Sequence, residues 1–386
     1  MKILSVFGTR PEAVKMAPVV RALKETAGIE SLVCVTAQHR QMLDQVLDLF
    51  EIRPDYDLDL MRDNQSLAEL SAAIFTNLEP VLAEFKPDWV LAQGDTITVA
   101  ITSMLAFYRR IKFGHVEAGL RTHNKWHPFP EEINRRIATA TADLHFAPTE
   151  WSRQNLLREN IEEGIIVVTG NPVIDALDHV SKQDEPAQIR ELLQTLGIDK
   201  QGRKRLILLT AHRRENFGKP IEDICQAVAK LASRGDVEIV YPVHLNPNVQ
   251  EPVNRLLKEV PHVTLLPPLD YLPLVHLMKQ AALILTDSGG IQEEAPTFGK
   301  PVLVLREVTE RPEGVAAGVA ALVGSDEEKI VALGSEALDG GGWAALRDGG
   351  VGNPYGDGRA GERIADIVVH TLTAAPRRTS DWEPPA

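Results

Sequence analysis

Two carboxylates stand at the ends of short apolar segments, where acid/base chemistry is commonly done. Asp95 follows a glycine directly after the segment 88–93, and Glu117 ends the segment 113–117. Asp95 could act as a general base or accept a hydrogen bond from a sugar hydroxyl, and Glu117 is an acid with no hydrophobic reason to stand at a strand end. The structural alternatives are a helix cap for Asp95 and an ion pair with Arg121 for Glu117.

A third carboxylate comes from a proline-rich stretch that follows the second. Pro130 predicts a helix start, with Glu131 and Glu132 in the first turn, where the helix dipole favours acids. The helix dipole by itself accounts for the presence of one of these two glutamates in the first turn. His123 and His127 are four residues apart, as in some zinc sites, but the intervening prolines disfavour a helix presenting both. No metal is expected.

Two cations follow the first apolar segment, residues 3–7. Arg10 and Lys15 lie in the first turns of a predicted helix, which Thr9 and Glu12 open as a capping box. Backbone N–H groups at such a helix start attract anions, and a guanidinium can bind a phosphate through two hydrogen bonds. The alternative is a solvated helix face.

The run Thr-Asp-Ser-Gly-Gly-Ile-Gln-Glu-Glu-Ala is the sharpest local signal for a nucleotide. Ser288, Gly289 and Gly290 lie between a predicted strand and a helix, so the backbone can approach a diphosphate. Glu294, one turn further, could accept hydrogen bonds from ribose. Arg311 follows the next strand and could add positive charge. The run is neither a P-loop nor a dinucleotide fingerprint.

Two further polar loops follow predicted strands in the second half of the chain. The loop 210–218 contains His212 and Arg213, and the segment 241–248 contains His244. Each loop comes directly after an apolar segment. A solvated loop is the alternative for the first.

Strand-like and helical segments alternate along most of the chain, and the pattern restarts after Asn171. This predicts an α/β fold with two doubly wound, Rossmann-like domains whose parallel sheets face a cleft. We expect residues 1–169 with a C-terminal helix at 358–373 in the first domain and 170–357 in the second. Residues 374–386 are expected to be a disordered tail.

Composition limits the classes of partner. The 386 residues include 41 basic and 54 acidic ones, a net charge of −13, which argues against nucleic acid or an anionic membrane as partner. Two cysteines form no disulfide framework or CxxC motif. No apolar run approaches the ~18 residues that span a bilayer. We expect a cytoplasmic protein.

The motifs taken together resemble the bacterial non-hydrolysing UDP-N-acetylglucosamine 2-epimerases. The resemblance covers residues 1–372. It is carried by the blocks FGTRPEAVKMAP, TAQHRQMLDQVL, GDT, GHVEAGLRT, PFPEEINR, HRRENFG, YPVHLNPNV, LTDSGGIQEEAP, GKPVLVLR, TERPE and NPYGDG. It implies a fold like that of GT-B glycosyltransferases, with the last helix returning to the first domain.

The resemblance also implies a reaction without cofactor. UDP is eliminated from UDP-GlcNAc to leave 2-acetamidoglucal and is then re-added to give UDP-ManNAc, which supplies cell-surface polysaccharide. It implies catalytic roles for Asp95, Glu117, Glu131 and His212. It implies substrate binding by Arg10, Lys15, Arg213, Leu274, Ser288, Gly289, Gly290, Glu294 and Arg311. A homodimer is expected.

The chain departs from the family pattern at a few positions. Trp126 and His127 replace Tyr and Ser, and Leu274 stands where Phe is frequent. Asn64 replaces an Arg of members that UDP-GlcNAc activates, in a site that would here include Gln38, Gln41, Glu131, Arg213 and His244. Alternative functions are a hydrolysing 2-epimerase that releases UDP and ManNAc, a glycosyltransferase, and a non-catalytic nucleotide-sugar binding protein.

Overall fold

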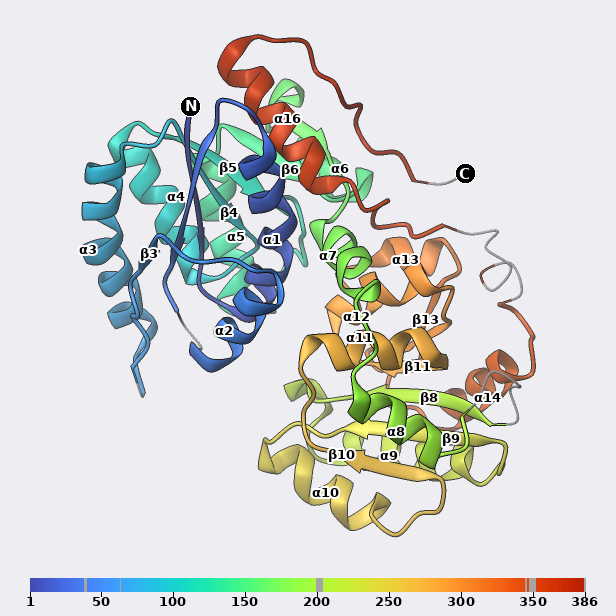
Figure 1. Cartoon of the computed structure of the whole chain (residues 1–386). Coiled ribbons are helices and arrows are strands. Elements are labelled where there is room, and N and C mark those ends of the chain that lie inside the picture. The colour runs from blue at the N-terminus through green and yellow to red at the C-terminus, as the bar shows by residue number, and fades with distance from the viewer. Residues whose placement is uncertain (38–39, 63, 199–203, 344–345, 347–351, 385–386) are drawn as a thin grey trace. The chain divides into compact units, whose positions relative to one another are not determined.

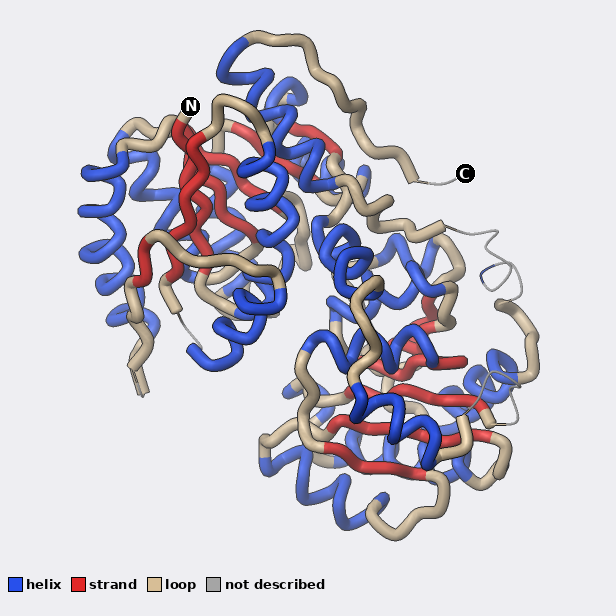
Figure 2. The backbone as a smooth tube through the Cα atoms, in the orientation of Figure 1, coloured by secondary structure: helices blue, strands red, loops and turns tan. Residues whose placement is uncertain are grey.

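The computed structural model describes the chain except residues 38–39, 63, 199–203, 344–345, 347–351 and 385–386. It divides into two compact units. Unit 1 comprises Met1–Ala176 and Tyr355–Pro384, and unit 2 contains Leu177–Pro354. Each unit is a parallel sheet with helices between successive strands (Figures 1 and 2). The predicted α/β class with two Rossmann-like sheets is confirmed.

Unit 1 contains a seven-stranded sheet in the order β3-β2-β1-β4-β5-β6-β7. Its strands are β1 (Lys2–Phe7), β2 (Glu30–Val35), β3 (Tyr56–Asp57), β4 (Trp89–Gln93), β5 (Lys112–Val116), β6 (Leu144–Ala147) and β7 (Ile166–Val168). Its helices are α1 (Arg10–Glu25), α2 (Arg40–Leu49), α3 (Leu67–Phe85), α4 (Ile97–Arg109), α5 (Glu131–Thr141), α6 (Glu150–Arg158), the 3₁₀ turn η1 (Glu163–Ile165) and α16 (Ala360–Thr373). The chain enters unit 2 within α7 (Pro172–Ser181).

The sheet of unit 1 is buried because its strands are apolar on both faces, as parallel sheets require. Helices α3 and α4 pack on each other on one side of the sheet, and α1 and α16 pack on each other on the other side (Figure 1). The strand order reverses between β1 and β4. Ligands of such folds bind at the carboxyl ends of the strands beside this reversal.

Unit 2 contains a six-stranded parallel sheet in the order β10-β9-β8-β11-β12-β13. Its strands are β8 (Arg205–Thr210), β9 (Val237–Pro242), β10 (Val263–Leu266), β11 (Ala281–Thr286), β12 (Val302–Val304) and β13 (Ala320–Leu322). Its helices are α8 (Ala187–Thr195), η2 (Arg214–Asn216), α9 (Lys219–Ala232), α10 (Pro247–Leu257), α11 (Tyr271–Gln280), α12 (Gly289–Glu294), η3 (Ala295–Phe298), α13 (Pro312–Ala316) and α14 (Glu327–Leu338). Here the order reverses between β8 and β11.

The last helix returns to unit 1, as expected from the resemblance. α16 approaches α1 so closely that a Cβ atom on Gly361 would lie 2.7 Å from the carbonyl oxygen of Pro18. Asp175, from α7, accepts hydrogen bonds from the N–H groups of Ala360 and Gly361 at 3.1 and 2.8 Å. These contacts fix where α16 begins.

The expected disorder of the C-terminal tail is wrong for residues 374–384. Trp382 is buried, and its N–H donates to the carbonyl oxygen of Val168 at 2.8 Å. Asp381 accepts the Val168 N–H at 3.2 Å. The tail therefore covers the free edge of β7, which would otherwise leave backbone groups unpaired.

Candidate active site

Glu117 directly follows β5 and is the most enclosed of the predicted catalytic carboxylates. Its side chain is 4% exposed and forms an ion pair with Lys15 of α1. The Gln93 side-chain amide also donates to it, and Asn171 Nδ2 donates to Oε1 at 3.0 Å. Glu117 has a φ of 63°, a left-handed conformation that costs free energy outside glycine and is common at functional sites.

These contacts decide between two earlier alternatives. Glu117 does not pair with Arg121, which instead forms two hydrogen bonds of 2.8 Å with Glu159. Lys15 does not lie on a solvated face, because it is buried beside Glu117. Its contacts support a role in holding Glu117 ionised, in addition to the predicted role in binding UDP.

Asp95 lies beyond the end of β4, at the strand reversal of unit 1. Arg135 of α5 donates to its Oδ2 atom from Nε at 2.9 Å and from Nη2 at 2.6 Å. The Asn134 side-chain amide holds the Asp95 carbonyl at 2.9 Å. Asp95 does not cap the following helix, because Thr96 is the N-cap residue of α4. Its side chain remains 28% exposed, so a substrate group could reach it.

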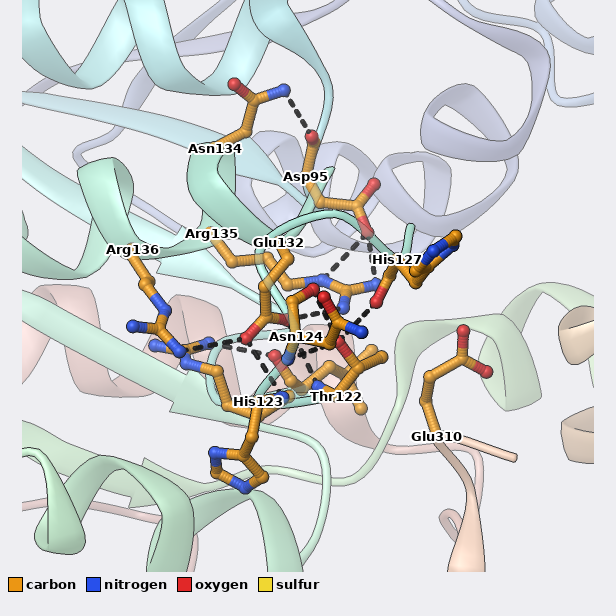
Figure 3. A network of polar contacts seen from close by, with 12 residues as sticks. Asp95, Thr122, His123, Asn124, His127, Glu132, Asn134, Arg135, Arg136 and Glu310 are labelled. Atoms are coloured by element: carbon orange, nitrogen blue, oxygen red, sulfur yellow. Dashed lines mark hydrogen bonds and ion pairs between the residues drawn. The ribbon is translucent and has the colours of Figure 1, made fainter. Parts of the chain in front are cut away.

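The two glutamates at the start of α5 differ in their surroundings. Glu132 is fully buried and accepts the N–H groups of Thr122 and His123 at 3.1 and 3.2 Å. Arg135 donates to it at 3.3 Å and so lies between Glu132 and Asp95 (Figure 3). Glu131 is only half-buried. Glu132 is therefore the glutamate with the structural role, and Glu131 remains the candidate for chemistry.

Glu12 links the loops that follow β1 and β4. Its Oε2 atom accepts the N–H groups of Gly8 and Thr9 at 2.8 and 2.7 Å, which confirms that Glu12 reaches back as the predicted capping box requires. Its other oxygen accepts the hydroxyl of Thr96. Burial raises the pKa of Glu12, against the lowering effect of these hydrogen bonds. Arg10 is the first residue of α1 and is half-buried.

His115, on β5, is a neutral neighbour of this group of carboxylates. Its Nε2 atom lies 2.7 Å from the carbonyl oxygen of Gly94. Burial lowers its pKa to about 4. In the part of the chain that is described, no three His, Cys, Asp or Glu side chains gather as metal ligands would.

In unit 2, Asp287 organises the strand reversal between β8 and β11. It is fully buried, and its Oδ2 atom accepts the N–H groups of His212 and Arg213 at 2.8 and 2.7 Å. Asn216 Nδ2 donates to the same atom at 2.9 Å. The loop 211–216 is thereby tied to the end of β11.

The His212 ring lies against the His244 ring, with centroids 5.2 Å apart and planes 13° from parallel. The His212 side chain is 40% exposed, and Arg213 and His244 are exposed as well. The structure thus brings together a predicted catalytic histidine and a predicted allosteric one. A ligand that reaches one ring is within reach of the other.

The predicted nucleotide segment begins α12, as expected. Arg311 Nε donates to Glu293 Oε1 at 2.7 Å. A Cβ atom on Gly289 would lie 2.6 Å from Arg311 Cζ, so the guanidinium rests directly on the glycine backbone. Tyr271 donates its hydroxyl to Glu294 at 2.6 Å. Ser288 and Gly290 are half-buried in the same short segment.

Burial alone would raise the pKa of Glu310, but Arg311 and Arg306 beside it lower it to about 2. The positive charge that was expected near α12 is therefore partly balanced by a permanent negative charge. Arg306 also pairs with Glu215. These arginines are held in place by acids of the same unit.

The remaining predicted positions are less constrained. Trp126 is exposed and stacks on Phe129 at 5.8 Å, and His127 and Asn64 are exposed, while Leu274 is half-buried. Gln38 lies outside the described residues, and of Gln41 only its place in α2 is described.

Comparison with known proteins identifies the family. A profile of the UDP-N-acetylglucosamine 2-epimerase family matches residues 21–369. A UDP-N-acetylglucosamine 2-epimerase of Salmonella typhimurium is 56% identical, over 95% of this chain and 98% of its own. The chain belongs to the UDP-N-acetylglucosamine 2-epimerase family. It is therefore an enzyme, an isomerase, and the resemblance of its motifs is confirmed.

Solved structures of this family share the fold. The enzyme of Neisseria meningitidis bound to UDP-GlcNAc has a TM-score of 0.87 and 48% identity, covering 97% of this chain and all of that one. A co-structure of Staphylococcus aureus MnaA with UDP has a TM-score of 0.89 and 44% identity, covering 99% of this chain and 100% of that one.

Among the residues that the structure describes, none of the helices combines the length and the apolar composition that a membrane span requires.

Sequence reasoning missed the partners of the predicted residues. Gln93 and Asn171 contact Glu117, Arg135 contacts Asp95, and Asp287 holds the His212 loop. Most of them stand at strand ends, as the predicted residues do. Asking where each strand-end polar side chain finds its hydrogen bonds would have drawn attention to Asn171 and Asp287.

Proposed function

We propose that this enzyme interconverts UDP-GlcNAc and UDP-ManNAc without hydrolysis. The observation that carries the proposal is the buried Glu117 carboxylate, which Lys15, Gln93 and Asn171 contact and whose backbone is in the left-handed region. Backbone conformations of this kind cluster at active sites, where a general base has to be positioned against one atom of its substrate.

The reaction requires an elimination because the C2–H bond of the sugar is only weakly acidic. A carboxylate accepts the C2 proton while the C1–O bond breaks, and the electron pair of that bond leaves with UDP. The products are 2-acetamidoglucal and UDP. UDP then adds back to C1 as a proton is delivered to the opposite face of C2, so no atom is gained or lost.

Inversion at C2 needs proton-transfer groups for both faces, and we assign these to Asp95, Glu117 and Glu131. Departure of UDP needs cations and N–H groups at the diphosphate. We assign this role to Arg10, Lys15, His212, Arg213, Arg311 and the segment Ser288, Gly289 and Gly290. Glu294 is the acceptor for ribose, and Leu274 contributes to the uracil side.

The test is an incubation of the pure enzyme with UDP-GlcNAc in D₂O, without added cofactor. UDP-ManNAc carrying deuterium at C2 is expected. Free ManNAc with stoichiometric UDP would instead indicate the hydrolysing reaction, and binding without turnover would indicate a nucleotide-sugar binding protein. Either result would overturn the proposal.

A pair of variants tests the role of Glu117. Glu117→Gln preserves the shape but removes the base, so deuterium incorporation should fall by roughly 10²- to 10⁴-fold. Glu150→Gln is the matched control, because Glu150 lies on the exposed first turn of α6. Equal loss in both variants would refute the assignment.

We also propose that the enzyme is a cytoplasmic homodimer that supplies ManNAc units for cell-surface polysaccharide. Sedimentation of the pure protein tests the dimer. Addition of UDP-GlcNAc to a UDP-ManNAc assay tests activation through His244 and its neighbours. A linear initial rate in UDP-ManNAc alone would indicate that no activator is required.

A further inference from the structure

The chain passes between the two units twice, and the two crossover segments, 169–176 and 355–363, are bound to each other within unit 1. The N–H of Asn171 donates to the carbonyl oxygen of Tyr355 at 2.7 Å. A Cβ atom on Gly356 would lie 3.3 Å from the Asn171 nitrogen, so the backbones are in direct contact. Arg363 also donates to the Thr169 carbonyl at 3.1 Å.

Asn171 is fully buried and has each of its polar groups engaged. Its Oδ1 atom accepts the Val173 N–H at 3.1 Å, at the start of α7. This bond fixes the orientation of the side-chain amide. Its Nδ2 atom is thereby directed at Glu117 Oε1, 3.0 Å away.

We propose that Asn171 is the positioning residue that sets the orientation and proton affinity of Glu117, and that it makes Glu117 sensitive to the conformation of the crossover segments. The proposal rests on the proposed role of Glu117 as a base. Two donors to Glu117 belong to the elements around the sheet of unit 1, Lys15 to α1 and Gln93 to β4. Asn171 is a donor that comes from a crossover segment.

The expected consequences follow from what the bond does. A hydrogen bond to the ionised carboxylate favours that form, so its loss must raise the pH at which Glu117 ionises. Among the described residues, the charged and titratable groups near Glu117 include Lys15 of α1 and the His115 ring, whose pKa burial lowers to about 4, and Asp95 and Arg121 lie near that ring. A substitution at Asn171 removes none of these groups.

The experiment compares Asn171→Ala and Asn171→Asp with Val173→Ala, which removes buried methyl groups from the same turn but leaves the amide. Asn171→Ala should lower kcat on the order of 10- to 100-fold, with UDP affinity unchanged. The acid limb of the pH profile of kcat should move to higher pH by about 0.5 to 1 unit. Val173→Ala should alter stability without moving that limb.

Asn171→Asp keeps the volume of the side chain and the hydrogen bond from the Val173 N–H. It therefore serves as the test variant if Asn171→Ala does not fold. It places a second carboxyl group 3.0 Å from Glu117, and the two cannot both ionise freely. The acid limb of the pH profile is therefore expected to move further upward than in Asn171→Ala. An unmoved acid limb in this variant would overturn the proposal.

A direct titration separates this proposal from the proposed function. The carboxyl carbon of Glu117 is followed by ¹³C NMR in labelled protein and assigned by its absence in Glu117→Gln. An upward shift in Asn171→Ala, which adds no charge, supports the positioning role even if no epimerisation is found. An unchanged titration with normal epimerisation refutes the positioning role alone.

Gly356→Ala tests the dependence on the crossover segments. The added Cβ atom would press on the Asn171 backbone from the second segment, without contacting Glu117. The acid limb should move in the same direction as in Asn171→Ala, by a smaller amount. A wild-type profile in a folded Gly356→Ala variant would show that Glu117 does not respond to these segments.

Discussion

Replacing Asp287 by Asn should release the loop that carries His212. The carboxylate accepts three hydrogen bonds through one oxygen atom, from two backbone N–H groups and from Asn216. An amide oxygen is neutral, and hydrogen bonds to a charged acceptor are about twice as strong as neutral ones. Each bond is therefore expected to weaken by about 1 kcal/mol, or about 3 kcal/mol for the three.

Hydrogen exchange measures this effect where it arises. The amides of His212 and Arg213 donate directly to Asp287, so their protection should fall by at least tenfold, which corresponds to about 1.4 kcal/mol. Urea unfolding should show a loss of about 2–4 kcal/mol for the whole protein. The rate of epimerisation should fall because His212 is no longer held.

The control for this substitution is Asp178→Asn, which breaks an exposed ion pair with Lys182 and should leave stability nearly unchanged. Unchanged exchange at His212 and Arg213 in Asp287→Asn would refute the reasoning. So would a loss of protection spread evenly over unit 2. The first result would mean that the loop is held by other contacts.

Two further substitutions give distinct results. Gly289→Ala should displace the Arg311 guanidinium, which lies within 2.6 Å of the new Cβ position, and weaken UDP binding roughly 10-fold or more, measured by calorimetry; unchanged affinity would remove Arg311 from the UDP site. Burial raises the pKa of Asp175 from 3.8 to about 7, so Asp175 loses its proton at a lower pH in the unfolded state than in the folded state. The free energy of unfolding should therefore fall as the pH rises from about 4 to 7, by up to about 4 kcal/mol. Asp175→Asn should remove that part of the slope in urea unfolding, and identical slopes for both proteins would contradict the assignment.

The features that were predictable from sequence are those whose causes are local. Alternating apolar segments and helical patterns gave both sheets, because each segment carries its own periodicity. The box formed by Thr9 and Glu12 opens α1 as predicted, since the residues that form it are three apart. The start of α5 after Pro130 was predictable for the same reason.

Ion pairs across the sheet were not predictable, because their partners are distant in sequence. Lys15 and Glu117 are 102 residues apart, and Arg135 and Asp95 are 40 apart. Spacing says nothing about which strand end meets which helix. The tail was misjudged because its composition is polar and proline-rich, whereas its contact with β7 spans 213 residues.

The two best-defined candidate carboxylates are each paired with a cation, Glu117 with Lys15 and Asp95 with Arg135, and the basicity of a carboxylate constrains the mechanism. A carboxylate is a weak base, so it cannot remove a C2 proton from an unactivated sugar at a useful rate. The barrier must then be lowered mainly by departure of the diphosphate, which places the largest catalytic demand on the cations and N–H groups that bind UDP. Substitutions at the UDP-binding residues are thus expected to lower kcat as well as affinity, since those contacts strengthen as the C1–O bond breaks.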